Sequence, residues 1–138
     1  MIKFINNSSE IPYVKFKEKY DQAYSAKQGL IEAIAISSYS SDLNEVNSRF
    51  VNLKILNSKE FIFFSNYNSP KSQEFSDHNQ ITALIYWRKT NVQIRLKAIV
   101  KKTSQEFNKA YFLNRSKQKN ALAISSNQSK PIDSFERV

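Results

Sequence analysis

Cysteine is missing from this chain of 138 residues, and histidine occurs once, at His78. Without cysteine the protein can form neither disulfides nor cysteine-ligated metal sites. A Ser-His-Asp triad or a zinc site is also disfavoured, because both usually depend on imidazole side chains. If the protein is an enzyme, we therefore expect a bound cofactor to carry its chemistry.

Long apolar stretches are also missing. No run of the sequence approaches the ~18 residues that a membrane-spanning helix needs. The first residues, MIKFINNSSEIPY, lack the apolar core and the small-residue cleavage site of a signal peptide. We therefore expect a cytoplasmic protein without a membrane partner.

Acidic residues are few: the chain has 12 Asp and Glu and 21 Lys and Arg, which gives a net charge of +9. This charge fits nucleic acid, anionic lipid or a phosphorylated small molecule, or simply a solvated surface. No block of five or six like charges is present, which argues against a nucleic-acid-binding tail. Hydrophobic residues make up 41% of the chain and aromatic residues 13%, which predicts a single globular domain with its own core.

The pattern of residues predicts five strands with helices placed around them. The expected strands cover residues 31–38, 48–56, 60–66, 80–87 and 92–102, and the last of these alternates most clearly between apolar and polar positions. The expected helices cover residues 11–28, 69–78, 104–115 and 119–126, and residues 126–138 are expected to form a loop. Short turns between the strands indicate a small antiparallel barrel with peripheral helices.

The sequence predicts three parts within this single domain. We expect residues 1–30 to form an N-terminal helical segment, residues 31–102 the barrel strands, and residues 103–138 helices and a C-terminal loop. The sequence contains no internal repeat and no low-complexity tract.

The stretch FIFFSNYNSPKSQEF, residues 61–75, passes from a strand to a helix through a turn without glycine. Ser69 suits the N-cap and Pro70 the first helical position. A helix N-terminus favours a phosphate, and Lys71 and Ser65 add a cation and a hydroxyl there. The alternative is an ordinary capped turn that binds nothing.

Five other side chains are candidates for a binding site. Arg49 and Lys54 are five apart on one predicted strand, so they face opposite sides unless the strand bulges or two subunits share a site. Tyr111 and Arg115 are four apart on a predicted helix, and a phenol beside a guanidinium suits a phosphate. Gln93 carries an amide that can read the edge of a heterocycle. Each of these is also compatible with an ordinary surface or packing role.

Taken in order, the segments RFVNLK, FIFFSNYNSPKSQEF, ITALIYW, VQIRL, AYFLNR and SNQSKPI resemble the pyridoxamine 5′-phosphate oxidase family of FMN-dependent split-barrel flavoproteins. The resemblance covers residues 31–132. It implies a mainly β fold with peripheral helices (α+β), an antiparallel split β-barrel of the FMN-binding type, and a homodimer with its site between the subunits. It further implies oxidation of pyridoxamine or pyridoxine 5′-phosphate to pyridoxal 5′-phosphate. Hydride passes from the substrate to the flavin, which oxygen reoxidises with release of hydrogen peroxide.

The resemblance also assigns residues to the site. The implied FMN contacts are Arg49, Lys54, Phe64, Ser65, Lys71, Gln93, Gln128 and Ser129. The implied substrate contacts are Lys54, Tyr111, Arg115 and Lys119. No catalytic side chain and no metal is expected, because the flavin carries the chemistry.

The chain departs from the family at several positions. Pro70, Lys119 and Ile124 stand where the family has arginine, serine and tryptophan, and the family's C-terminal segment has no counterpart. A second hypothesis is therefore a split-barrel protein that binds FMN or pyridoxal phosphate without turnover. A remote third is a nucleic-acid-binding barrel, which is disfavoured because the polar face of residues 92–102 carries cations but no aromatic side chain.

Overall fold

The computed structural model describes residues 1–66, 70–104, 119–126 and 134–137, with the backbone alone at 66, 70–73, 119–126 and 134–137. The strands are β1 (Lys3–Ile5), β2 (Ala33–Ser40), β3 (Glu45–Asn57), β4 (Glu60–Asn66), β5 (Gln80–Trp87), β6 (Val92–Lys102), β7 (Lys119–Ser126) and β8 (Ser134–Arg137). The helices are α1 (Ile11–Ser25) and α2 (Pro70–Asp77), with a short 3₁₀ turn, η1 (Arg88–Thr90).

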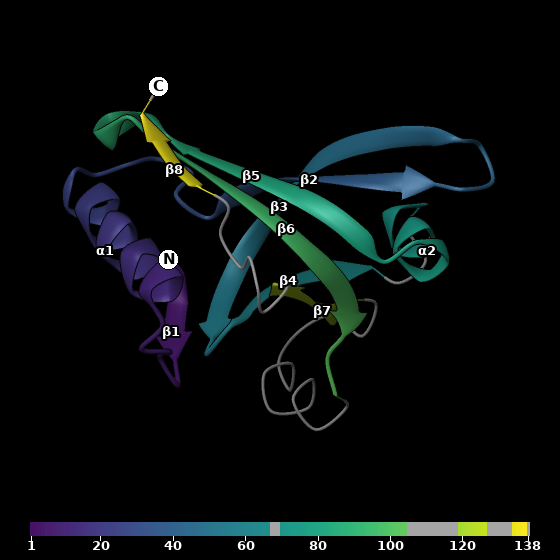
Figure 1. The fold of residues 1–138 in the computed structure, drawn as a ribbon, viewed down its shortest axis with the longest axis horizontal. Coiled ribbons are helices and arrows are strands. Elements are labelled where there is room, and N and C mark those ends of the chain that lie inside the picture. Colours follow the sequence, from purple (N-terminus) through teal and green to yellow (C-terminus); the bar gives the residue numbers. More distant parts are fainter. Residues whose placement is uncertain (67–69, 105–118, 127–133, 138) are drawn as a thin grey trace.

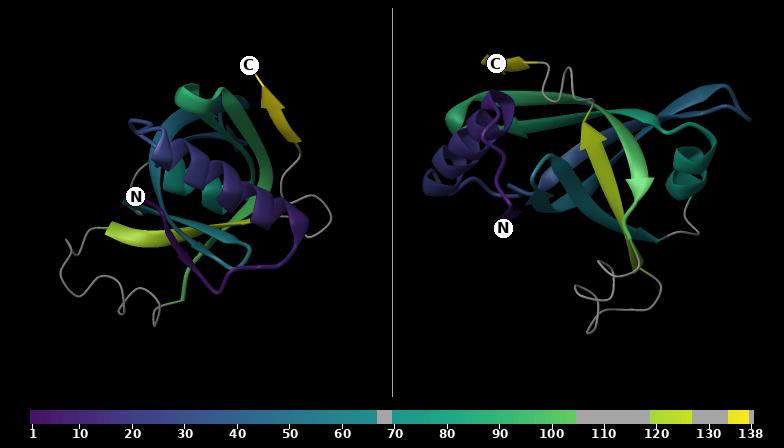
Figure 2. Two further views of the ribbon diagram at one scale, coloured as in Figure 1. Left: turned by 90° about the vertical axis from the view of Figure 1, so that its left-hand side faces the viewer. Right: turned by 60° about the horizontal axis from the view of Figure 1, so that its bottom comes forward.

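The strands form one curled sheet in the order β1-β3-β2-β5-β6-β7-β4. Strand β4 also pairs with β3, so the sheet closes on itself as a barrel (Figures 1 and 2). All ladders are antiparallel except the short β1–β3 pairing, and β8 adds to β6 outside the ring. This arrangement is the predicted antiparallel split barrel.

Alternation along the strands builds the core. In β2, Ile34 and Ile36 are fully buried while their neighbours are half-exposed, and β5 alternates in the same way down to Trp87. One face of α1 lies against the end of the barrel, where the Phe16 ring meets Phe61 edge-on at 5.1 Å and Trp87 at 5.7 Å. Helix α2 lies at the opposite end (Figure 1).

Two of the predicted elements are wrong. Residues 119–126, expected as a helix, form strand β7, because the gap between β4 and β6 offers backbone groups on both sides that a strand satisfies. Within the expected loop at 126–138, residues Ser134–Arg137 pair with β6 as β8. The expected helix at 104–115 lies almost wholly outside the described residues.

The other predicted strands and helices are confirmed with small shifts of their ends. Helix α1 stops at Ser25 because Lys27, two residues later, adopts a left-handed conformation with φ 60°. Strand β1 was not predicted. Neither helix within the described parts of the chain has the length and apolarity to cross a membrane.

Candidate functional site

A buried hydroxyl marks the end of the barrel beside α2. Ser65 is 4% exposed and lies on the inner face of β4, the face that also carries Phe61 and Phe63. Its Oγ atom has no hydrogen-bond partner among the described residues. A buried polar atom without a partner costs about 1–3 kcal/mol, so such atoms require an explanation, and a bound ligand is one.

Helix α2 brings its N-terminal turn to the same end. Phe75 inserts into the barrel, and its ring meets Phe63 at 6.1 Å in a T-shaped contact. Pro70 begins the helix and Lys71 lies in its first turn, although the side chain of Lys71 is not described. The expected cap, Ser69, lies outside the described residues. The free N–H groups of such a turn attract an anion.

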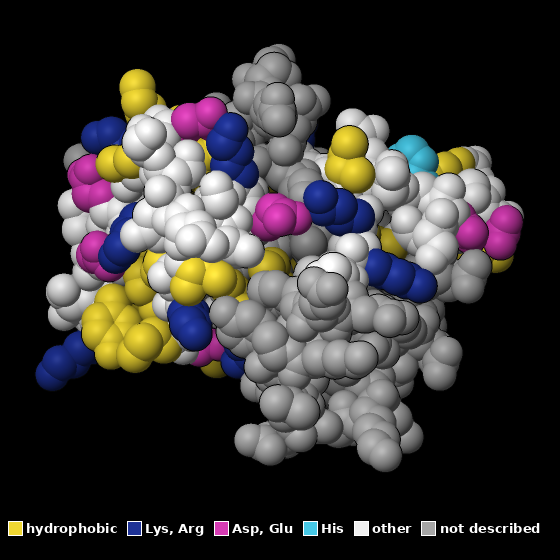
Figure 3. Space-filling view, turned by 90° about the horizontal axis from the view of Figure 1, so that it is seen from below, with side chains coloured by type: hydrophobic (Ala, Val, Ile, Leu, Met, Phe, Trp, Pro, Cys, Tyr) yellow, Lys and Arg dark blue, Asp and Glu magenta, His cyan; other side chains and the backbone are white. Residues whose placement is uncertain are grey.

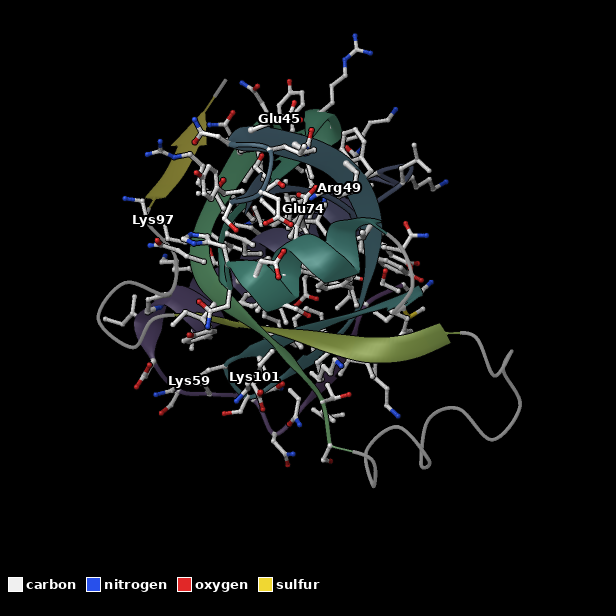
Figure 4. All side chains as sticks on the ribbon, turned by 90° about the vertical axis from the view of Figure 1, so that its right-hand side faces the viewer. Glu45, Arg49, Lys59, Glu74, Lys97 and Lys101 are labelled. Atoms are coloured by element: carbon white, nitrogen blue, oxygen red, sulfur yellow. The ribbon has the colours of Figure 1, made fainter. Side chains whose placement is uncertain are left out.

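A polar cluster holds α2 to the barrel wall. Arg49 donates through Nη2 to Oε1 of Glu74 at 3.2 Å, and through Nη1 to Ser38 Oγ at 2.6 Å and to the Ile36 carbonyl at 3.4 Å. Ser38 Oγ donates to Glu74 Oε1 at 2.5 Å, and Asn47 Nδ2 donates to Glu74 Oε2 at 3.0 Å. Figure 4 looks into this end and shows Arg49 and Glu74 together near its centre.

The cluster keeps Glu74 ionised. Burial raises the pKa of Glu74, but the hydrogen bonds from Ser38, Arg49 and Asn47, together with the charge of Arg49, lower it by more, so the net pKa lies below its ordinary value. The side chains of Arg49 and Glu74 are only 21% and 12% exposed. The guanidinium of Arg49 therefore has an internal counter-ion at neutral pH.

Lys54 engages a different carboxylate. The β3–β4 register shifts between Leu53 and Ile55, so Lys54 lies at a bulge of β3. Its Nζ donates to Oε2 of Glu32 at 2.8 Å, and the amino group of Met1 binds the other oxygen of that carboxylate. The bulge considered from the sequence is present, but Arg49 and Lys54 belong to two separate ion pairs.

Gln93 lies on the outer face of the sheet. It pairs in register with Tyr86 and is two residues from Arg95, which opposes Leu84. These side chains continue across β2 to Phe50 of β3, on the side of the sheet away from Ile34 and Ile36. Arg49 points to the inner side, so one chain does not bring Gln93 and Arg49 together.

The described surface includes two hollows of similar volume. One of about 360 Å³ lies on the outer face near Gln93 and is lined by Ser37, Ser48, Thr82, Leu84, Arg95 and Lys97, among others. The other, of about 400 Å³, lies between β1 and α1 at the opposite end from α2, with Phe4, Tyr13 and Lys17 among its lining residues. No residue assigned to the site from the sequence is among the residues that line either hollow.

Of the remaining residues predicted for the site, the structure describes two and leaves four undescribed. Phe64 is half-buried on β4 next to Ser65. Lys119 begins β7 and lies opposite Asn66 in the ladder, so its backbone is beside the turn that leads to α2. Tyr111, Arg115, Gln128 and Ser129 lie outside the described residues. In the described part of the chain, no group of His, Asp and Glu could hold a metal ion.

Three residues at this end were missed from the sequence: Ser38, Asn47 and Glu74. Ser38 and Asn47 oppose each other on β2 and β3, and Glu74 reaches them from α2. The only sequence signal was the position of Glu74 one turn after Pro70. Nothing in the sequence indicated which strands it would contact.

Comparison with known proteins places the chain in a family. No family model matches it. It is 33% identical over 123 residues to pyridoxine/pyridoxamine 5′-phosphate oxidase 1 of Hydrogenovibrio crunogenus, which covers 89% of this chain and 56% of that protein. It is 30% identical over 134 residues to the corresponding oxidase of Rhodopirellula baltica, covering 96% and 60%. This chain is a homologue of the pyridoxine/pyridoxamine 5′-phosphate oxidases. It spans under two thirds of the length of these curated relatives.

Solved structures confirm the fold of this oxidase homologue. A pyridoxamine 5′-phosphate oxidase-related, FMN-binding protein of Nostoc punctiforme matches with a TM-score of 0.73 at 8% identity, over 94% of this chain and 98% of that one. PhzG of Burkholderia lata, solved with tetrahydrophenazine-1-carboxylic acid, matches with a TM-score of 0.74 at 16% identity, over 83% and 76%. At these identities the likeness concerns the split-barrel fold alone.

Proposed function

We propose that this oxidase homologue binds FMN at the end of the barrel where β4 leads into α2. The observation that carries the proposal is the buried Ser65 hydroxyl, which has no partner among the described residues and lies near the end of β4, five residues before α2 begins at Pro70. Ser65 would bond the flavin, while the N–H groups of α2 and Lys71 would hold its phosphate. The other proposed FMN contacts are Arg49, Lys54, Phe64, Gln93, Gln128 and Ser129.

The proposed reaction is oxidation of pyridoxamine or pyridoxine 5′-phosphate to pyridoxal 5′-phosphate with oxygen as the acceptor. It is supported by the names of curated relatives at 30–33% identity. Bound FMN would supply hydride acceptance and electron transfer to oxygen. The residues of the chain would bind and orient, with Tyr111, Arg115 and Lys119 at the substrate phosphate and Lys54 at the substrate.

A homodimer would complete this site. Gln93 and Arg49 lie on opposite faces of one sheet, so a single flavin meets both only when Gln93 comes from a second copy. The outer face is suited to such a contact, because Phe50, Leu84 and Tyr86 are 76%, 41% and 46% exposed on it. We therefore propose that this face of β3, β2, β5 and β6 is the dimer interface.

A second candidate is FMN binding without oxidase turnover. It is favoured by the departures at Pro70 and Lys119, which stand where the family has an arginine and a serine. The distribution of charge on the described surface argues against nucleic-acid binding. On the face seen in Figure 3 the described Lys and Arg side chains are separated by acidic and uncharged ones.

The flavin proposal is tested by titrating the purified protein with FMN and following the quenching of flavin fluorescence. The wild type should saturate, and Ser65→Ala and Lys71→Ala should each weaken binding about tenfold, the equivalent of one charge-assisted hydrogen bond. Lys15→Ala, on the exposed side of α1, is the matched control. Equal affinity in all four proteins would refute the site.

Peroxide release on adding pyridoxamine 5′-phosphate to the FMN-loaded protein separates the two candidate functions. Release at a rate that depends on substrate concentration supports the oxidase. Saturable FMN binding without peroxide supports the binding protein instead.

A further inference from the structure

Helix α2 depends on the barrel for its position. It has eight residues, and isolated helices shorter than ~12–15 residues are marginal in water. Its contacts with the barrel therefore decide where its N-terminal turn lies. Two residues of α2 bind the barrel wall: Phe75, through its ring, and Glu74, through its carboxylate.

The barrel wall provides hydrogen-bond donors from three side chains for the carboxylate of Glu74. Ser38 pairs with Asn47 and Ile36 pairs with Arg49, two rungs apart in the β2–β3 ladder, so the side chains of Ser38, Asn47 and Arg49 project from one patch of the inner face. Glu74 accepts from Ser38 and Arg49 through Oε1 and from Asn47 through Oε2. Both oxygens are thus satisfied by strands that lie far from α2 in the sequence.

Arg49 contacts two successive residues of α2. Besides its bond to Glu74, its guanidinium carbon lies 6.0 Å from the centre of the Phe75 ring, within the range of a cation–π contact. Its Nη1 is held by Ser38 and by the carbonyl of Ile36. The guanidinium of Arg49 therefore fastens α2 to the barrel wall through both Glu74 and Phe75.

We infer that Arg49 and Glu74 are a docking pair that fixes α2 to β2 and β3, and that Glu74 acts on FMN binding through the position of α2. Glu74 is a positioning residue in this account. The inference rests on the proposed FMN site and adds Glu74 to the residues that build it. It predicts that disrupting either partner displaces the N-terminal turn of α2.

The direction in which Glu74→Gln changes FMN affinity separates two roles of this carboxylate. If Glu74 only neutralised Arg49, Glu74→Gln would free the charge of Arg49 and tighten FMN binding. If the pair positions α2, Glu74→Gln loosens the helix and weakens FMN binding by about tenfold. Arg49→Gln should weaken binding at least as much, and the double variant should bind no more weakly than Arg49→Gln, because both changes remove one shared interaction.

The experiment combines two measurements on the full chain, FMN titration and amide hydrogen exchange of the apo-protein. Exchange in peptides covering residues 70–77 should be about tenfold faster in Arg49→Gln and Glu74→Gln than in the wild type. Glu60→Gln is the control, since it breaks the exposed Lys101–Glu60 ion pair elsewhere on the barrel and should change neither measurement. Asn47→Ala removes only one donor to Glu74, so it serves as a milder variant if the others fold poorly.

The outcomes distinguish this inference from the proposed function. Faster exchange in α2 together with weaker FMN binding supports the docking pair. Tighter FMN binding by Glu74→Gln, or unchanged exchange in α2, overturns it. If the wild type does not bind FMN, the proposed function fails, and the exchange measurement alone then decides whether Arg49 and Glu74 dock the helix.

Discussion

The two ends of the barrel are built differently. At the α1 end, aromatic rings fill the opening and the buried polar groups of Tyr20 and Trp87 are paired, Tyr20 Oη accepting from the Ile2 amide and Trp87 Nε1 donating to the Ile31 carbonyl. At the α2 end, an ion pair and its hydrogen bonds lie beside a single pair of rings, Phe63 and Phe75, and the Ser65 hydroxyl has no described partner. The first end is built for stability, and the second retains polar groups that a ligand can use.

Removing a ring from the α1 end should give the largest loss of stability. Phe16 is fully buried between Phe61 and Trp87, so Phe16→Ala should lower the free energy of unfolding by about 3–5 kcal/mol. The measurement is urea denaturation followed by tryptophan fluorescence. FMN affinity of the folded fraction should stay within about twofold of the wild type. A large loss of FMN affinity would show that the two ends are not independent.

Acid should selectively weaken the α2 end. Because the pKa of Glu74 is lower in the folded protein than its ordinary 4.5, its ionised form stabilises the fold above that pH. This contribution is lost as the pH falls below 4.5 towards the folded-state pKa.

Glu74→Gln should therefore flatten the acid limb of the stability curve. The measurement is the denaturation midpoint of both proteins between about pH 6 and pH 3. Equal acid sensitivity in Glu74→Gln and the wild type would contradict the assignment of this carboxylate.

Ser65→Ala should affect stability and binding in opposite directions. Deleting a buried hydroxyl without a partner should raise the free energy of unfolding of the apo-protein by ~1 kcal/mol, while FMN binding weakens. Thermal unfolding with and without FMN measures both effects. A destabilised apo-protein would show that the hydroxyl has a structural partner.

The smallest effect is expected on the solvent side of α1. Lys15 and Glu18 form an exposed ion pair with a nitrogen–oxygen distance of 3.7 Å, so Lys15→Ala should change stability by less than ~0.5 kcal/mol. Any larger change measured by urea denaturation would mean that α1 depends on more than its buried aromatic face.

The sequence predicted those strands and helices whose position depends on a local pattern of residues. The alternation from Val92 to Lys102 gave β6, and Pro70 marked the start of α2. The expected helix at 119–126 is instead strand β7, because these residues pair with β4 and β6, and such long-range pairing cannot be seen in a local pattern.

The candidate site was only partly predictable. Ser65 was found because it precedes the turn into α2. The Glu74 cluster was missed because its partners Ser38 and Arg49 lie 36 and 25 residues away in the sequence, and only the packing of α2 brings them together. The opposite faces taken by Gln93 and Arg49 also became visible only once the strands were placed in register.

The most direct test of the central claim is amide hydrogen exchange of the full chain with and without FMN. The account predicts protection in peptides covering β4 and α2, residues 60–66 and 70–77, and no change in α1, residues 11–25. Protection confined to α1 and β1, around the hollow lined by Phe4, Tyr13 and Lys17, would contradict it and place the flavin at the wrong end of the barrel.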